Sequence, residues 1–334
     1  MKHTAKTAIA AGLCIWGANA LPQDFNQGPV FTVIEENDLV VNTDRHYTQG
    51  IRVSFLTGDN KAPGFVKSLS EALPHPGYEP AAVRTGIVIG QNIYTPADTQ
   101  VRELIPNDRP YSGWLYIGLP LQRRGLANDR WITLESLQLD LGIVGEDSLA
   151  EDAQIWVHEV RGFELPEGWD NQIETEPGLA LKYQRSIRFA PKNLERNLDF
   201  TPHAGICLGN VETSLRTGLA IRAGFNVPDD FGVQTVSSLL TTEGGASAGN
   251  NRISAYIFAT VEGWLVAYST FLDGNMYHSS HSVDREWGVL ECKGGVALGM
   301  RYGEFAMSYV YRTREFSGQQ ENNSYGSLSF KVKF

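Results

Sequence analysis

Polar side chains that could activate water or bind a cation gather where two extended runs of this chain meet. Asn37 and Asp38 end one run, and Thr48 precedes the next, Ile51–Leu56. Two strand-like runs around a short polar connector predict a β-hairpin. An amide, a carboxylate and a hydroxyl therefore come together at its tip. We interpret this tip as half of an active site, and we expect His158 to supply the other half.

A helix is expected around that histidine. Residues 148–160 carry apolar side chains without the alternation of a strand, and Gly162 follows as a stop signal. Ser148 with Glu151 three residues later has the spacing of a capping box. The pattern predicts one helix inserted in a long loop.

His158 follows Gln154 by four residues, so both side chains project from one face of that helix. On spacing alone, a histidine on an amphipathic helix is most often a solvated residue of the polar face. Its setting favours function, because long loops with their own structure tend to carry binding or catalytic residues.

Other catalytic motifs are missing from the sequence. Ser112 lacks the flanking glycines of a nucleophile elbow, and there is no phosphate-binding glycine loop or paired metal motif. Cys207 and Cys292 have no neighbouring histidine and acid, and we interpret them as separate small residues rather than a disulfide. With these motifs excluded, the catalytic chemistry still open is that of a histidine with a carboxylate, with or without a metal ion.

About twelve strand-like segments, mostly antiparallel neighbours, position these residues. Alternating segments of about ten residues separated by turns are typical of outer-membrane barrels. A β-sandwich shows a similar alternation, so periodicity alone leaves both architectures open. No later segment is long and apolar enough for a transmembrane helix, so a membrane-spanning form would have to be a closed barrel.

The charge of the chain limits its possible partners, and its first residues predict its compartment. The chain has 334 residues, a formal net charge of −10 and an isoelectric point near 5.2. This acidic balance argues against nucleic acid, whose phosphates need clustered Lys and Arg. A basic start, an apolar run and Ala18-Asn19-Ala20 predict a signal peptide over residues 1–20, leaving residues 21–334 as the mature domain.

Five short motifs, in order, resemble the outer-membrane lipid A 3-O-deacylase family of the LpxR type. They are Glu36-Asn37-Asp38, the run from Thr43 to Gly50, Gln91 to Pro96, Asp108 to Trp114, and Gln154-x-x-x-His158 followed by Gly168 to Gln172. They span about the first half of the mature chain, and the strand pattern continues to the end.

The resemblance implies an all-β fold, a twelve-stranded antiparallel transmembrane β-barrel with a short helix inserted in an outer loop. It implies calcium-dependent removal of the 3′-acyloxyacyl group of lipid A at the bacterial outer membrane. Matched by motif, the family's site falls on Asn37, Asp38, Thr48 and His158. The family also has a lysine in the loop after the third strand, where this chain has Val101 with Arg102 beside it.

These residue types suit ester hydrolysis. A neutral imidazole can take a proton from water, a role that we assign to His158. Asp38, with backbone carbonyls and water, would bind Ca²⁺, while Asn37 and Thr48 would stabilise the oxyanion or orient the water. We expect a monomer bound to lipopolysaccharide. The alternatives are a phospholipase-like acyl hydrolase and a non-catalytic barrel such as a porin or adhesin.

Overall fold

The computed structural model describes residues 25–38, 45–127, 131–191, 193–240 and 253–334, so the expected signal peptide lies outside the described residues. The strands are β1 (Val30–Asn37), β2 (His46–Leu56), β3 (Glu79–Thr95), β4 (Ser112–Ala127), β5 (Trp131–Val144), β6 (Glu176–Arg188), β7 (Leu198–Gly209), β8 (Glu212–Phe225), β9 (Ser254–Ser269), β10 (Gly288–Met300), β11 (Gly303–Arg312) and β12 (Asn323–Lys333). The helices are α1 (Gly64–Ala72), α2 (Ala150–Arg161) and α3 (Thr270–Asp273).

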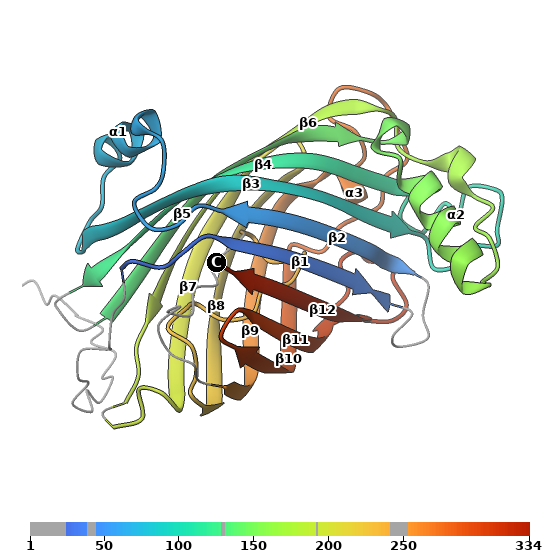
Figure 1. The fold of residues 1–334 in the computed structure, drawn as a ribbon. Helices are drawn as coiled ribbons and strands as arrows, with labels where there is room; N and C mark the ends of the chain where they lie inside the picture. Colours follow the sequence, from blue (N-terminus) through green and yellow to red (C-terminus); the bar gives the residue numbers. More distant parts are fainter. Residues whose placement is uncertain (1–24, 39–44, 128–130, 192, 241–252) are drawn as a thin grey trace, which may run out of the picture.

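The strands close into one barrel. Every strand pairs antiparallel with its sequence neighbours, and β1 pairs with β12 to complete the ring (Figure 1). The predicted twelve-stranded antiparallel barrel is therefore confirmed. One end of the barrel holds α1 together with Pro29 and Phe334, near the two ends of the described chain, and we call it the terminal end. The opposite end carries α2, and we call it the far end.

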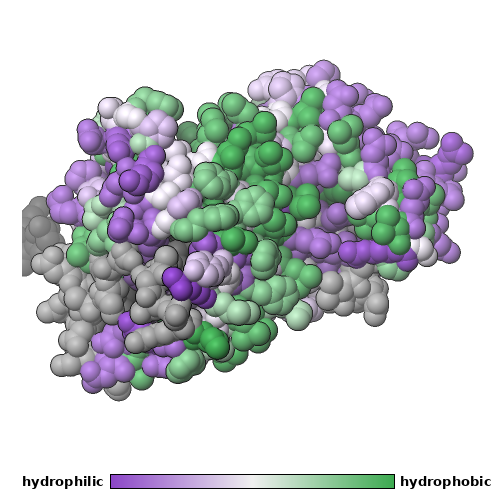
Figure 2. Space-filling view, in the orientation of Figure 1, coloured by the Kyte–Doolittle hydropathy of each residue, from purple (hydrophilic) through white to green (hydrophobic). Residues whose placement is uncertain are grey.

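Side chains alternate along each strand between a polar lumen and an apolar outer surface. On β11, for example, Glu304 and Arg312 are buried inside, whereas Phe305 and Met307 are about half exposed outside. On the face shown in Figure 2, hydrophobic residues form a band across the middle of the barrel, with hydrophilic residues toward both ends. This arrangement, the reverse of a soluble protein, is that of a barrel surrounded by lipid.

None of the helices in the described part of the chain is long and apolar enough to cross a membrane. Helix α2 forms where it was predicted and ends at Gly162, whose φ of 73° is a left-handed helix cap. The predicted capping box is wrong. Leu149 is the N-cap, and Ser148 lies in a preceding 3-10 turn where its hydroxyl donates to the Gly145 carbonyl.

The long connection between β8 and β9 folds back into the lumen of the barrel. We call its residues 226–240 the plug segment; its apolar side chains Val227, Phe231, Val233, Val236, Leu239 and Leu240 are all buried. The carboxylate of Asp230 forms ion pairs with Arg222 and Lys331 on the barrel wall. The plug segment explains why this turn at the terminal end is so long.

The tip of the plug segment reaches the lumenal side of β1. The backbone N–H of Val236 donates to a carboxylate oxygen of Glu36 at 2.8 Å, and the Tyr47 hydroxyl donates to the other oxygen at 2.8 Å. Arg216 donates to the Ser237 carbonyl at 3.0 Å. The plug segment thus spans the lumen from the terminal end to the level of the predicted site.

Candidate active site on the outer wall

Alternation along β1 decides which side of the barrel wall carries the site. Glu36 faces the lumen, where it binds the plug segment, so its neighbour Asn37 faces outward. Asn37 is directly opposite Gln49 of β2 and Gly326 of β12. Its side chain is only 5% exposed although it faces away from the lumen, so other parts of the protein cover this patch of outer wall.

Thr48 directly precedes Gln49, the cross-strand partner of Asn37, at a point where β2 is irregular. The register shifts between Tyr47 and Gln49, which makes Thr48 the extra residue of a β-bulge. Its hydroxyl is 2.7 Å from the hydroxyl of Thr95 at the end of β3. Bulges redirect side chains next to active sites, and this one links β2 to β3 at the far end.

Asp38 follows directly after β1 and is fully buried. One carboxylate oxygen accepts a hydrogen bond from the backbone N–H of Arg45 at 2.7 Å. This bond closes the predicted hairpin connector and fixes the carboxylate beside Asn37. The residues between them, 39–44, lie outside the described part of the chain.

Helix α2 packs against the outside of the wall at the same end. Ile93 of β3, Tyr111, Ala150 and Trp169 form one buried cluster. Ile93 faces outward because its neighbour Tyr94 stacks in the lumen on Phe271. The helix therefore covers the outer face of the barrel and does not close its mouth.

His158 is on the side of α2 that faces the wall. The buried positions of the helix are Ala150, Gln154, Val157 and His158, which share one face. His158 is 2% exposed, and its Nδ1 is 2.5 Å from the carbonyl oxygen of Glu164. A carbonyl can only accept, so Nδ1 carries the proton and Nε2 of the neutral ring is the basic nitrogen.

Two contacts hold the helix and its histidine in place. Gln154 accepts a hydrogen bond from the Trp169 indole N–H at 2.9 Å, and both side chains are buried. Arg161 forms an ion pair of 3.1 Å with Glu35 on the outward face of β1. The structure thus brings the wall residues and α2 to one face of the barrel, with Glu35 two residues before Asn37.

Negative charge surrounds the start of α2. Burial raises the pKa of Glu151, and the carboxylates of Asp152, Asp170 and Glu146 raise it further. Arg102 is exposed and only 3.7 Å from the Asp170 carboxylate, with its backbone carbonyl bound by Asn171 at 2.7 Å. Its guanidinium therefore stays at the surface near α2.

A comparison with protein-family models matches this chain over residues 7–334 to the family described as outer membrane protein LpxR. The chain belongs to the LpxR family. It is accordingly a protein of the bacterial outer membrane, as predicted. The solved structure of LpxR from Salmonella typhimurium is similar at 22% sequence identity, with a TM-score of 0.71 over 91% of this chain and 100% of the other.

More distant barrels share less with the LpxR fold. The KdgM porin matches with 5% identity and a TM-score of 0.39, over 91% of this chain and 99% of its own. The β-domain of the Bordetella autotransporter BrkA matches with 11% identity and a TM-score of 0.43, over 92% of this chain and 100% of its own. A search of curated protein sequences found no match.

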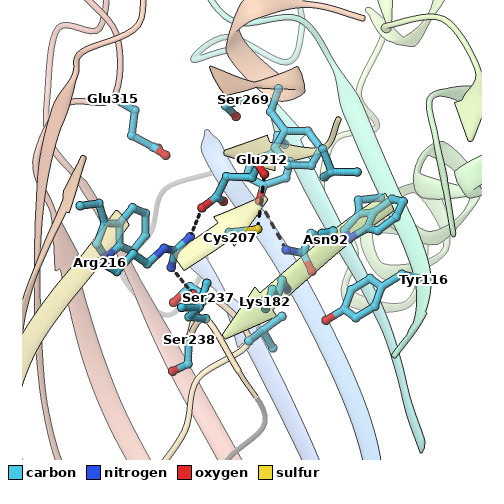
Figure 3. Close-up of a pocket in the computed structure, with 18 of the residues that line it drawn as sticks. Asn92, Tyr116, Lys182, Cys207, Glu212, Arg216, Ser237, Ser238, Ser269 and Glu315 are labelled. Carbon is cyan, nitrogen blue, oxygen red and sulfur yellow. Dashed lines mark hydrogen bonds and ion pairs between the residues drawn. The ribbon is translucent and has the colours of Figure 1, made fainter. Parts of the chain in front are cut away.

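A separate cavity of about 80 Å³ lies inside this LpxR-family barrel, between the tip of the plug segment and the wall (Figure 3). Its charged side chains are paired: Arg216 with Glu212 at 2.6 Å, and Lys182 with Asp140 at 2.7 Å. The predicted site residues do not line it. The cavity is therefore a space among the polar side chains of the lumen and is separate from the predicted site.

Several positioning residues were missed at the sequence level. The sequence patterns did not predict the contacts that Thr95, Trp169 and Glu35 make around the site. A signal for Glu35 was available, because a charged residue two positions before Asn37 shares its outward face. Cys207 and Cys292 are free, as expected.

Proposed function

We propose that this protein is an outer-membrane esterase that removes the 3′-linked acyloxyacyl group from lipid A by hydrolysis. The observation that carries the proposal is the position of the site. Asn37, Thr48 and the wall-facing side of α2 lie on the outside of the barrel at the far end, where the wall meets lipid. A substrate held in the outer leaflet reaches such a site laterally, without entering the lumen.

The residues present suit water-mediated ester hydrolysis. Nε2 of His158 accepts the proton of the attacking water, since Nδ1 is already committed to the Glu164 carbonyl. The Asn37 amide and the Thr48 hydroxyl provide hydrogen bonds for the water or the developing oxyanion. Glu164 acts here through its backbone alone, so it orients the imidazole without adding charge.

The donor set also suits calcium. Asp38 offers a buried carboxylate, and hard cations such as Ca²⁺ take oxygen ligands. Among the described residues no group of three or more His, Cys, Asp or Glu side chains is placed to hold a metal, so backbone carbonyls and water would complete the shell. Bound there, Ca²⁺ would polarise the ester carbonyl as a Lewis acid.

The lumen argues against the porin alternative. The plug segment crosses it, and ion pairs such as Arg222–Asp230 and Arg216–Glu212 lie inside it. A porin needs a continuous water-filled channel, whereas a lipid hydrolase on the outer wall does not. The phospholipase-like alternative would use the same wall site and is separated from lipid A hydrolysis by its substrate.

A lipid panel tests the proposal. Detergent-solubilised protein is incubated with hexa-acylated lipid A or with phosphatidylethanolamine, first with calcium and then with chelator. The products are identified by mass spectrometry. We expect calcium-dependent loss of one acyloxyacyl unit from lipid A only, from a protein that is monomeric in detergent. Hydrolysis of the phospholipid instead would establish the phospholipase alternative, and no product in any condition would overturn the enzyme proposal.

A further inference from the structure

Helix α1 lies on the outside of the barrel wall at the terminal end. Its buried residues Val66 and Ser70 are four positions apart and face the wall. Val66 packs with Ala62 and Leu121, and Val83 and Leu137 pack against this cluster. These strand residues face outward, toward lipid, so α1 is not a lid over the lumen.

A guanidinium clamps the end of this helix to the wall. Arg123 of β4 donates to the carbonyl oxygens of Ser70 and Leu73 at 2.9 Å and of Pro74 at 2.8 Å. It also forms an ion pair of 2.6 Å with Glu135 of β5, and both side chains are buried. Carbonyls at a helix C-terminus lack partners within the helix, so this clamp fixes the orientation of α1.

The two flanks of α1 that remain uncovered differ in character. Phe65, Leu69 and Ala72 follow the i, i+4, i+7 spacing of one helix face, and Phe65 and Leu69 are 75% and 50% exposed. Lys67 and Glu71 form the opposite flank. The helix therefore has one side on the wall, one apolar flank and one charged flank.

The apolar flank lies at the edge of the lipid-facing band. Leu121, which packs with α1, is opposite Thr85, and the next outward residue of β3 is the exposed Ile87. Along the same face of β3, Val83 contacts α1 and Ile93 contacts α2. Ten residues of a strand tilted by about 40° rise roughly 25 Å, which is the height of the apolar band of such barrels.

Helices α1 and α2 thus bracket the membrane-spanning part of β3. Helix α2, at the other edge, also exposes an apolar pair spaced i, i+4, Trp156 and Val160, which are 64% and 67% exposed. Amphipathic helices with this pattern lie in the interface of a bilayer. With the far end at the outer leaflet, as in the proposed function, the terminal end lies at the periplasmic leaflet. We propose that the Phe65–Leu69 flank of α1 is seated in that leaflet and contacts the acyl chains of its glycerophospholipids.

Spin-label depth measurements test this inference independently of any hydrolase activity. Leu69→Cys and, as a matched control on the charged flank, Glu71→Cys are made in a chain whose own cysteines are replaced by alanine. Each is labelled with a nitroxide and reconstituted in vesicles of phosphatidylethanolamine and phosphatidylglycerol. Collision rates with oxygen and with a water-soluble nickel chelate then report the depth of each label.

The Leu69 label is expected about 5–10 Å below the phosphates, the depth of interfacial helices, and the Glu71 label at or above them. A Leu69 label as accessible to the nickel chelate as the Glu71 label would overturn the inference. Dipolar broadening between Leu69 labels would also overturn it, since a second copy of the chain would then cover the flank. Phe65→Cys repeats the measurement if Leu69→Cys folds poorly, as judged by heat-dependent mobility in gels.

Discussion

Gly113 of β4 offers a way to move helix α2, which carries His158, without changing a predicted site residue. It faces outward beneath the start of α2, and a Cβ built on it would lie 2.0 Å from Ser148 Oγ and 2.3 Å from Ala150 Cβ. Ordinary contacts of a Cβ begin at 3.4 Å. The substitution Gly113→Ala therefore pushes the N-terminal end of α2 away from the wall.

The required displacement sets the size of the effect. The Cβ of Ala150 is bonded directly to the helix backbone and no side-chain rotation can move it. The helix must therefore shift by about 1 Å to bring the two Cβ atoms to van der Waals distance. A misplacement of that size, even far from the chemistry, can lower a rate by about 100-fold. We expect a fall of this order in kcat, because His158 is on the same helix and moves relative to Asn37 and Thr48.

Gly263 of β9 provides the matched control. A Cβ there meets no atom within 4 Å, so Gly263→Ala tests the same change where there is space. Both variants are assayed for release of acyloxyacyl groups from lipid A, with heat-dependent gel mobility as the test of barrel folding. Equal activity of folded Gly113→Ala and Gly263→Ala would show that catalysis does not depend on how closely α2 packs.

Four further variants probe other contacts of the barrel. Trp169→Phe removes the buried hydrogen bond to Gln154, which contributes about 1 kcal/mol. Because the loop that carries α2 then opens more often, trypsin should cut it roughly fivefold faster. An unchanged cleavage rate would contradict this. Arg161→Ala and Glu35→Ala should each lower kcat/KM less than about fivefold, because the pair is about 40% exposed and worth about 0.2–1 kcal/mol; a 100-fold loss would require another role for either residue. Deleting residues 229–239 should create discrete conductance in planar bilayers that the intact protein lacks, and conductance of the intact protein would refute the role of the plug segment.

The strand pattern and the inserted helix could be predicted because both depend on local periodicity. The lumenal course of residues 226–240 could not, since this stretch has no regular period and partners such as Glu36 and Lys331 are far away in sequence. The failed capping box has a local reason: Leu149 adopts a left-handed conformation with φ of 58° and becomes the N-cap, so the helix starts at Ala150, two residues after Ser148. Periodicity also cannot say which face of β1 points outward, because a period of two is symmetric between faces.

We propose that His158, on the side of α2 that faces the outer wall of the barrel, activates water against an ester of lipid A. The most direct test compares the intact protein with His158→Ala in lipid A hydrolysis followed by mass spectrometry, with calcium present and folding verified. We predict that the intact protein releases one 3′-acyloxyacyl unit and that the variant is at least about 100-fold slower, as expected for loss of a general base. A folded His158→Ala variant that retains the full rate would contradict the account.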